Sequence, residues 1–311
     1  MPTIFWGAPT LRPAAMAAAI FTCFLVLPAP SPRAQDITPE IENFSDTLDV
    51  PFVPSDHKVL QAMFEFTKPT KDDFLIDLGS GDGRIVITAA KEFGLRGYGV
   101  DLNKGLVRVA NARAARAGVA DRAKFYVRNL FEEDIGRASI VTMYLLPEVV
   151  LQLRPKLFAE LKPGSRIASH DYHLGNWRPD AARVVDVDSR GDESIVYYWM
   201  VPAKVGGTWS WNLEYPGQFY EPVSYQAVID QHFQDIEGRV EANILPIRIH
   251  DATLSGTRIA FSVTGEIEDR IVRHDFLGVV DGDVITGSVR ISGGVRDMTV
   301  PWSARRTKAT N

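Results

Sequence analysis

The chain has 311 residues, of which 45% are apolar, and this composition allows two ordinary domains and excludes a largely disordered protein. The net charge of −5 gives no basic surface across the whole sequence, so nucleic acid held through its phosphates is not expected as a partner. The single cysteine, Cys23, excludes a disulfide framework and a thiolate metal site in the folded part.

The amino-terminal residues 1–34 are expected to be a signal peptide or a membrane anchor. An apolar run at 14–27 follows Arg12 and precedes a stretch rich in Pro, Ser and Ala, a pattern typical of secretory signals. The protein is therefore expected to be exported or tethered near a membrane. A start codon assigned too early is the alternative, favoured by the single basic residue before the run and by Pro32, and it would leave the protein in the cytoplasm.

Residues 35–50 contain five acidic residues and no basic one, and are expected to form a solvated linker. From residue 51 onward, short apolar strands alternate with segments of helical spacing. Strands are expected at 74–76, 97–100, 124–127, 139–145 and 166–169, and helices at 59–66, 85–93, 106–117 and 149–161. This alternation predicts an α/β domain over 51–202, with a doubly wound parallel sheet and a closing antiparallel hairpin at 183–187 and 194–201.

Beyond residue 202 the helical pattern stops, and β-branched or alternating stretches lie between turns rich in Gly and Asp. Strands are expected at 208–213, 258–263, 271–279, 284–291 and 298–302. We therefore expect a second, all-β domain over 203–305, a small barrel or sandwich, followed by a tail at 306–311. An aromatic cluster near its start is expected to pack the barrel rather than to line a ligand cavity; it comprises Trp209, Trp211, Tyr215, Phe219 and Tyr220.

The segment from Asp77 to Gly83 carries the chemistry of the first domain. A glycine-rich turn between a strand and a helix serves several nucleotides, so it is a weak signal by itself. Here two carboxylates, Asp77 and Asp82, flank or interrupt the glycines and would repel a pyrophosphate. They suit a cofactor with a sulfonium and an ammonium group, such as S-adenosylmethionine. Asp101, 24 residues after Asp77, ends the next strand, where a carboxylate can accept both ribose hydroxyls.

These residues, together with Pro51 to Ser55 and Asp101 to Asn103, resemble the class I, Rossmann-like methyltransferases that use S-adenosylmethionine. The motifs are most similar to the small archaeal and mitochondrial protein-lysine methyltransferases, over about residues 51–200. The resemblance implies that the cofactor contacts Asp77 through its amino group, Asp101 through its ribose and Asn129 through its adenine. Asn129 stands where many relatives have an aspartate. The complete implied set of cofactor-binding residues is Asp77, Gly79, Ser80, Gly81, Asp82, Gly83, Asp101, Asn103 and Asn129.

The residues after the fourth and fifth strands are expected to meet the methyl acceptor. The candidates are Tyr144, Glu148 and Asp171, although Tyr144 suits packing at a strand end and Glu148 suits a first-turn acid beside a helix dipole. The expected partner is a protein substrate that presents a lysine side chain. Its amine must lose a proton before it attacks, and Glu148 and Asp171 are the candidate proton acceptors. No metal is expected at the pair His170 and Asp171.

Two functions remain open from the sequence. In one, the protein is an active methyltransferase that N-methylates a protein lysine by in-line transfer. In the other, it is a binding or structural protein of the cell envelope that retains the fold without turnover, because S-adenosylmethionine is made in the cytosol. The intact glycine loop with both acids favours the enzyme.

Overall fold

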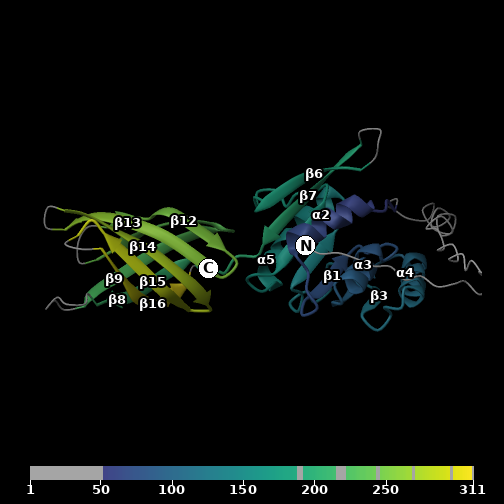
Figure 1. Ribbon diagram of the computed structural model, residues 1–311, viewed down its shortest axis with the longest axis horizontal. Coiled ribbons are helices and arrows are strands. Elements are labelled where there is room, and N and C mark those ends of the chain that lie inside the picture. Colours follow the sequence, from purple (N-terminus) through teal and green to yellow (C-terminus); the bar gives the residue numbers. More distant parts are fainter. Residues whose placement is uncertain are drawn as a thin grey trace, which may run out of the picture. The chain divides into compact units, whose positions relative to one another are not determined.

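The computed structural model describes residues 52–187, 192–214, 222–242, 246–267, 270–294 and 297–309. The predicted leader and the predicted linker, residues 1–50, lie outside these ranges. The described strands form two sheets, one of seven strands and one of nine (Figure 1). No helix within the described ranges is long and apolar enough to cross a bilayer.

Sheet A has the strand order β3-β2-β1-β4-β5-β7-β6. The first five strands in this order pair in parallel, and β7 is antiparallel to both β5 and β6. This arrangement confirms the predicted doubly wound sheet with its closing hairpin. The strands are β1 (Phe74–Leu78), β2 (Arg96–Asp101), β3 (Ala123–Val127), β4 (Ile140–Met143), β5 (Arg166–His170), β6 (Ala181–Asp186) and β7 (Glu193–Met200).

Four helices cover the two faces of sheet A. Successive side chains of β1 point to opposite faces and therefore show which helices cover each face. Leu75 packs in one buried cluster with side chains of α2 (His57–Thr67), α3 (Arg84–Glu92) and α4 (Lys104–Arg116). Its neighbour Ile76 packs in a second cluster with side chains of α5 (Pro147–Glu160). The carboxyl ends of β1, β2, β4 and β5 therefore meet at one edge of a sheet that is buried on both sides, which is where open α/β folds bind ligands.

Sheet B is antiparallel, and its strand order is β11-β10-β9-β8-β16-β15-β14-β13-β12. Its two terminal strands, β11 (Ile247–Arg248) and β12 (His250–Ser255), are consecutive in the chain and joined by Ile249. The backbone N–H of Ile249 donates to the carbonyl of Gly238 on β10, so the sheet curls into a nearly closed barrel. The other strands are β8 (Gly207–Leu213), β9 (Val223–His232), β10 (Asp235–Glu241), β13 (Arg258–Ile267), β14 (Arg270–Asp281), β15 (Val284–Ser292) and β16 (Met298–Ala309).

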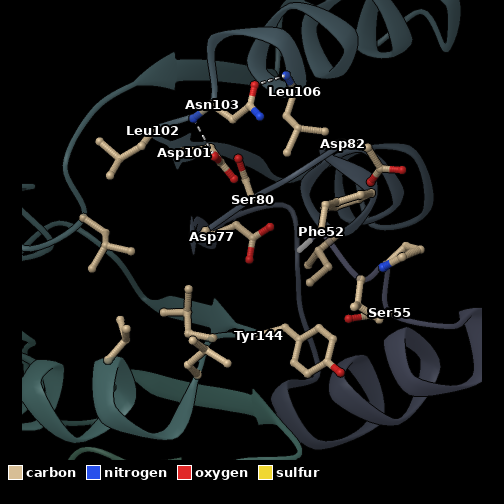
Figure 2. Close-up of a pocket in the computed structure, with 18 of the residues that line it drawn as sticks. Phe52, Ser55, Asp77, Ser80, Asp82, Asp101, Leu102, Asn103, Leu106 and Tyr144 are labelled. Carbon is tan, nitrogen blue, oxygen red and sulfur yellow. Dashed lines mark hydrogen bonds between the residues drawn. The ribbon is translucent and has the colours of Figure 1, made fainter. Parts of the chain in front are cut away.

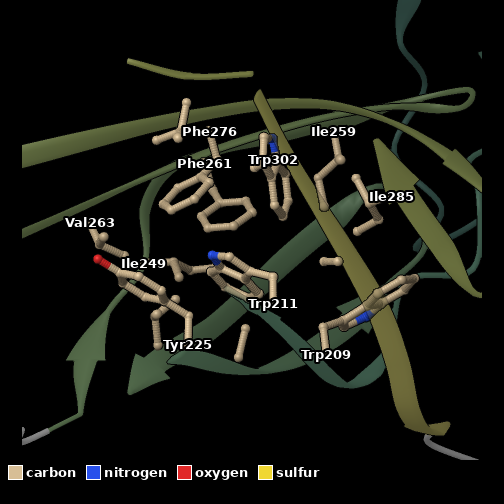
Figure 3. Close-up of a cluster of buried hydrophobic side chains, with 14 of the residues drawn as sticks. Trp209, Trp211, Tyr225, Ile249, Ile259, Phe261, Val263, Phe276, Ile285 and Trp302 are labelled. Carbon is tan, nitrogen blue, oxygen red and sulfur yellow. The ribbon is translucent and has the colours of Figure 1, made fainter. Parts of the chain in front are cut away.

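The interior of the barrel is filled by aromatic side chains (Figure 3). Trp211 lies edge to face with Trp302 at 5.4 Å between ring centroids and stacks on Tyr225 at 5.5 Å. Trp209 and Trp211 are thus packing residues, as the sequence indicated. The three other members of the predicted aromatic cluster, Tyr215, Phe219 and Tyr220, lie outside the described residues.

Sheet B differs from the sequence prediction in two respects. The strands β9, β10, β11 and β12 were not predicted; β10 offers only two buried apolar side chains, Ile236 and Val240. In addition, β16 runs on to Ala309, where a tail was expected after residue 305. This extension pairs with β8, since Ala309 lies opposite Gly207, and backbone pairing does not depend on apolar side chains.

Candidate active site

The glycine loop between β1 and α3 turns through three residues with a left-handed backbone. Gly79, Gly81 and Gly83 have φ angles of +76°, +50° and +79°, a region that is costly for a residue with a Cβ atom. A Cβ atom on Gly81 would lie 2.2 Å from a ring carbon of Phe52, and one on Gly83 would lie 2.5 Å from the ring of Phe125. Gly79 lines the cavity at the carboxyl edge of sheet A, whereas Gly81 and Gly83 do not. These two glycines therefore contribute by shaping the loop.

Asp101, the last residue of β2, ties the glycine loop to the start of α4. Its Oδ2 accepts from the backbone N–H of Gly81 at 2.9 Å, and its Oδ1 accepts from that of Asn103 at 2.8 Å. Asn103 caps α4, because its Oδ1 accepts from the backbone N–H groups of Gly105 and Leu106. Its oxygen is therefore committed to the helix start, and a contact with a cofactor falls to its amide nitrogen.

Asp77 presents a buried carboxylate oxygen that lacks a partner among the described residues. Its side chain is 1% exposed, and its Oδ1 accepts from the hydroxyl of Thr142 at 2.7 Å, whereas Oδ2 accepts no hydrogen bond. Burial, with the nearby charges of Asp101 and Asp82, raises the pKa of Asp77 to about 7. A buried, half-satisfied carboxylate of this kind is costly unless a cation pairs with it.

Asp82 lines the cavity, as expected for a cofactor-binding residue, but its charge is paired within the protein. Its carboxylate is 1% exposed and forms ion pairs with the guanidinium groups of Arg84 and Arg113. Burial alone would raise the pKa of Asp82, but the hydrogen bonds and charges of these two arginines hold it below its usual range. Its charge is thus already neutralised within the protein. Because the charge of Asp82 is neutralised, only Asp77 of the two acids is left to repel a pyrophosphate.

These groups surround a cavity of about 450 Å³ at the carboxyl edge of sheet A (Figure 2). The cavity brings together eight of the twelve predicted site residues: Asp77, Gly79, Ser80, Asp82, Asp101, Asn103, Asn129 and Tyr144. Gly81, Gly83, Glu148 and Asp171 do not line it. Ser80 is 6% exposed, and its hydroxyl has no partner among the described residues. Two hydrogen-bonding atoms, on Asp77 and Ser80, thus remain available to a ligand.

One end of the cavity suits a flat, aromatic ring. Leu102 and Phe131 line the cavity and are 69% and 40% exposed, respectively, so both present apolar surface to a ligand. Asn129 lies beside them; its Oδ1 accepts from the backbone N–H of Phe131 at 3.1 Å, and its amide donates to Glu132 at 2.9 Å. An amide oxygen has two lone pairs, so Asn129 can still accept from an adenine amino group, as predicted.

The other end is aromatic, and a buried histidine lies behind it. Tyr144 and Ser55 lie across Asp77 from Asp101 and Asn103 (Figure 2). The ring of Tyr144 lies 3.8 Å from that of His170 and 6.4 Å from that of Tyr172. Burial, and to a smaller extent the negative charge of Asp171, raises the pKa of Tyr144 to about 12. Tyr144 therefore remains a protonated phenol at neutral pH and can donate a hydrogen bond, but it does not take up a proton.

Asp171 and Glu148 are both outside the cavity. Asp171 has a φ of +61°, and its Oδ1 accepts from the backbone N–H of Ile195 at 2.9 Å, which fixes it behind His170. Glu148 is exposed in the first turn of α5, where its charge is favourable to the helix dipole. Neither carboxylate lines the cavity, although the side chain of Asp171 is hydrogen-bonded to Tyr144, which does.

Sequence reasoning missed several residues that form the walls of the cavity. Phe52, Ser55, Leu102, Phe131 and His170 were not among the predicted site residues, although all but His170 line the cavity. The motif from Pro51 to Ser55 carries the family resemblance, but the sequence pattern assigns no role to its members. Apolar residues one or two positions after Asp101 and Asn129, just beyond the ends of β2 and β3, are the signal that would have identified Leu102 and Phe131.

Comparisons with known proteins agree with this site. Residues 77–181 match the model of the ANTKMT methyltransferase domain. The chain is 42% identical over 153 residues to a protein-lysine N-methyltransferase of Saccharolobus islandicus, which covers 49% of this chain and 94% of that protein. The chain belongs to the class I S-adenosylmethionine-dependent methyltransferases. We refer to the part built on sheet A as the methyltransferase domain.

A further relative and a solved structure match a similar share of the chain. The adenine nucleotide translocase lysine N-methyltransferase of Mus musculus is 34% identical over 166 residues, which are 50% of this chain and 71% of that protein. A crystal structure of an RNA methyltransferase from Salinibacter ruber, in complex with S-adenosylhomocysteine, has 43% identity and a TM-score of 0.45. It covers 54% of this chain and all of that one.

The residues of the cavity fit S-adenosylmethionine, the cofactor of this enzyme class. Asp77 offers its unpaired oxygen to an ammonium group, Asp101 offers acceptors to a ribose, and the pair Leu102 and Phe131 offers apolar surface to an adenine. No group of three His, Cys, Asp or Glu side chains in the described part of the chain is arranged to hold a metal ion.

The affinity for S-adenosylhomocysteine is expected to fall as the pH decreases below about 7. The product keeps the ammonium group of the cofactor, so it requires an ionised Asp77, whose pKa is raised to about 7 in the free protein. Binding at lower pH must first remove a proton, so the dissociation constant is expected to rise by up to about tenfold per pH unit. Calorimetric titrations from pH 5.5 to 8.5 at constant ionic strength measure this slope. A dissociation constant that is flat over this range would contradict the assignment.

Proposed function

We propose that this protein transfers the methyl group of S-adenosylmethionine to the side-chain amine of a lysine in a protein substrate. The observation that carries the proposal is the 42% identity over nearly the whole archaeal protein-lysine N-methyltransferase, together with the family match that begins at the glycine loop. The lysine N-methyltransferase of Mus musculus described above points to the same kind of acceptor.

The side chains around the cavity define what the protein contributes to this reaction. When bound, the cofactor supplies a methyl group attached to a positively charged sulfur. Asp77 would hold its ammonium group and Asp101 its ribose, on either side of the sulfur, which fixes the position of that methyl group and supplies much of the acceleration through alignment. The apolar side chains of Val53, Leu146 and Val149 also line the cavity and lower its polarity. Because an ammonium is costly there, the pKa of the acceptor amine falls toward neutrality.

Mass spectrometry of cellular proteins tests the acceptor. Methylated lysines would be compared in cells that lack the gene, in cells complemented with the native gene, and in cells complemented with Asp101→Ala. We expect at least one lysine that is methylated only in the second strain. The same pattern in all three strains would refute lysine as the acceptor. If purified protein released no heat when titrated with S-adenosylhomocysteine, the non-catalytic alternative would hold.

Substitution of Glu148 by glutamine is expected to change the methyl-transfer rate by less than twofold. The side chain is exposed at the start of α5 and does not line the cavity, so removal of its charge affects only the helix dipole. Initial rates with radiolabelled cofactor measure the effect. A tenfold loss would restore Glu148 as a candidate for contact with the acceptor.

We also propose that the predicted leader keeps this activity at a membrane. The proposal is supported by the apolar run at 14–27 and by the exposed apolar side chains Val53 and Leu146 beside the cavity, which are 56% and 41% exposed. Fractionation of cells that express the full chain, followed by protease treatment of intact cells and of spheroplasts, tests the location. Recovery of the whole protein in the soluble cytoplasmic fraction would refute it.

A further inference from the structure

A polar cluster at the acceptor end of the cavity has no role in the function described so far. The hydroxyl oxygen of Ser55 lies 2.8 Å from Nδ1 of His170, although the two residues are 115 positions apart. Both side chains are buried, with exposed fractions of 5% and 3%. Ser55 lines the cavity, and His170 lies directly behind it. On the far side of the imidazole, Nε2 lies 3.4 Å from Oδ2 of Asp171.

The neighbours of His170 determine where its proton resides. A carboxylate can only accept hydrogen bonds, so Asp171 favours the tautomer with the proton on Nε2, although the present geometry is too long for a hydrogen bond. Nδ1 then carries a lone pair, and the hydroxyl of Ser55 donates to it. Burial lowers the pKa of His170, against the opposing effect of Asp171, so the imidazole is neutral at physiological pH. The lone pairs of Ser55 Oγ remain free to accept from a group in the cavity.

Ser55 is held in place independently of its hydroxyl. Its backbone carbonyl accepts from Nη1 of Arg84 at 2.8 Å, and the same guanidinium is paired with Asp82. The next residue, Asp56, caps α2 by accepting from the backbone N–H of Lys58. The segment that carries Ser55 is thus fixed both to the glycine loop and to a helix, so its side chain keeps its position without the contact to His170.

We propose that Ser55, His170 and Asp171 form a proton relay that deprotonates the acceptor amine. This inference rests on the proposed lysine acceptor. An N–H bond of the ammonium breaks and its proton passes to Oγ of Ser55, while the hydroxyl proton of Ser55 passes to Nδ1 of His170. The resulting imidazolium is stabilised by the negative charge of Asp171. The neutral amine then forms its bond to the methyl carbon as the bond from that carbon to sulfur breaks. The imidazolium returns its proton to solvent after product release.

Four other ionisable side chains at the cavity are committed to different tasks. Tyr144 stays protonated, and Asp82 is neutralised by two arginines. Asp101 accepts from two backbone N–H groups, and Asp77 is the partner for the ammonium of the cofactor. Ser55 alone among the described lining residues places a hydroxyl on a neutral imidazole. The geometry therefore favours Ser55 as the group that receives the proton.

Three variants test the relay. In His170→Asn, the amide oxygen can replace Nδ1 as the acceptor for Ser55 but cannot take up a proton. Ser55→Ala removes the hydroxyl, and Ser55→Thr, the matched control, retains it. The assay measures initial rates of tritium transfer from labelled S-adenosylmethionine to a protein extract of the native host that lacks the gene, at saturating cofactor, from pH 6.5 to 10. Calorimetry with S-adenosylhomocysteine measures cofactor-site affinity separately.

We expect His170→Asn and Ser55→Ala to lose about 100-fold in rate at pH 7, within the range usual for general base catalysis. The loss should shrink toward pH 10, because free amine then becomes available from solution. The dissociation constant for S-adenosylhomocysteine should stay within twofold of the native value in both variants, and Ser55→Thr should keep most of the rate. Nitrogen-15 NMR of the native protein should show His170 protonated on Nε2 alone.

Other results would overturn the relay. Variants with native rates across the pH range, or variants whose only defect is weaker binding of S-adenosylhomocysteine, would show that Ser55 and His170 merely hold the chain together. A proton on Nδ1 would overturn the relay whatever the acceptor is. By contrast, a native enzyme that labels no lysine in the extract, while His170 has the expected tautomer, would refute the proposed lysine acceptor.

Discussion

Replacement of Asp77 by asparagine is expected to raise the dissociation constant for S-adenosylhomocysteine at least 100-fold. The carboxylate is 1% exposed, and one of its oxygens has no partner in the described part of the protein. Loss of one member of a buried, hydrogen-bonded charge pair costs about 2–5 kcal/mol. A 100-fold change in the dissociation constant corresponds to about 2.7 kcal/mol and lies within this range. Asparagine keeps the shape of the side chain and can still accept a hydrogen bond from the hydroxyl of Thr142. The loss of affinity therefore measures the contribution of the negative charge.

The same substitution should not reduce the stability of the free protein. A buried carboxylate without a cation is unfavourable, so its replacement by a neutral amide is expected to leave the melting temperature unchanged or higher. Calorimetry and thermal unfolding measure the two effects. Asp121→Asn is the matched control, because Asp121 is 68% exposed and pairs only with its neighbour Arg122. A change in affinity of less than tenfold for Asp77→Asn would show that the ammonium binds elsewhere.

Asp101→Ala is expected to reduce both cofactor affinity and stability. The alanine cannot accept from the ribose, and it leaves the backbone N–H groups of Gly81 and Asn103 without their acceptor. We expect affinity for S-adenosylhomocysteine to fall at least 50-fold, and the melting temperature of the methyltransferase domain to fall by about 5 °C, because each unpaired polar group costs about 1–3 kcal/mol.

The comparison with Asp101→Asn separates these two contributions. Asparagine restores one acceptor for the loop but offers the ribose a single oxygen, so it should recover part of the lost stability and little of the affinity. Thermal unfolding and calorimetry of the two variants, measured side by side, give both quantities. Native affinity in Asp101→Ala would mean that the end of β2 does not contact the cofactor.

The sequence was sufficient for the parts of the site that are local. The strand, the glycine loop and the helix after it follow one another in the chain, so Asp77, Gly79 and Ser80 could be assigned from their order. Asp101 could be assigned because parallel strands bring their carboxyl ends to one edge. The cofactor class followed from these few residues.

The contacts that change the interpretation are long-range. Asp82 was expected to contact the cofactor, but Arg113 neutralises it from α4, 31 positions away. Neither the composition nor the periodicity of α4 indicates that this arginine turns toward the glycine loop. The contact between Ser55 and His170 joins the segment before α2 to the end of β5 and depends equally on the completed sheet. Partners of this kind are set by tertiary packing, which a sequence pattern does not specify.

The strands of sheet B show a second limit. The strand β9 alternates Tyr225, Ala227 and Ile229 toward the interior with mostly polar residues outside, but β10 has a largely polar sequence. Its position is fixed by backbone pairing with β9 over seven residues, and its glycine, Gly238, would clash with the carbonyl of Val228 if it carried a side chain. A strand that is positioned mainly by backbone pairing with an adjacent strand has a sequence that predicts its structure only weakly.

The junction at Ile249 has a consequence for how sheet B can meet other molecules. Strands at the margin of an open sheet present unpaired backbone groups that can recruit a strand from another chain. Here the two marginal strands continue into each other through a single residue, whose N–H is already donated to Gly238. The backbone groups at this junction are therefore less accessible to a strand of another chain than those at the margin of an open sheet.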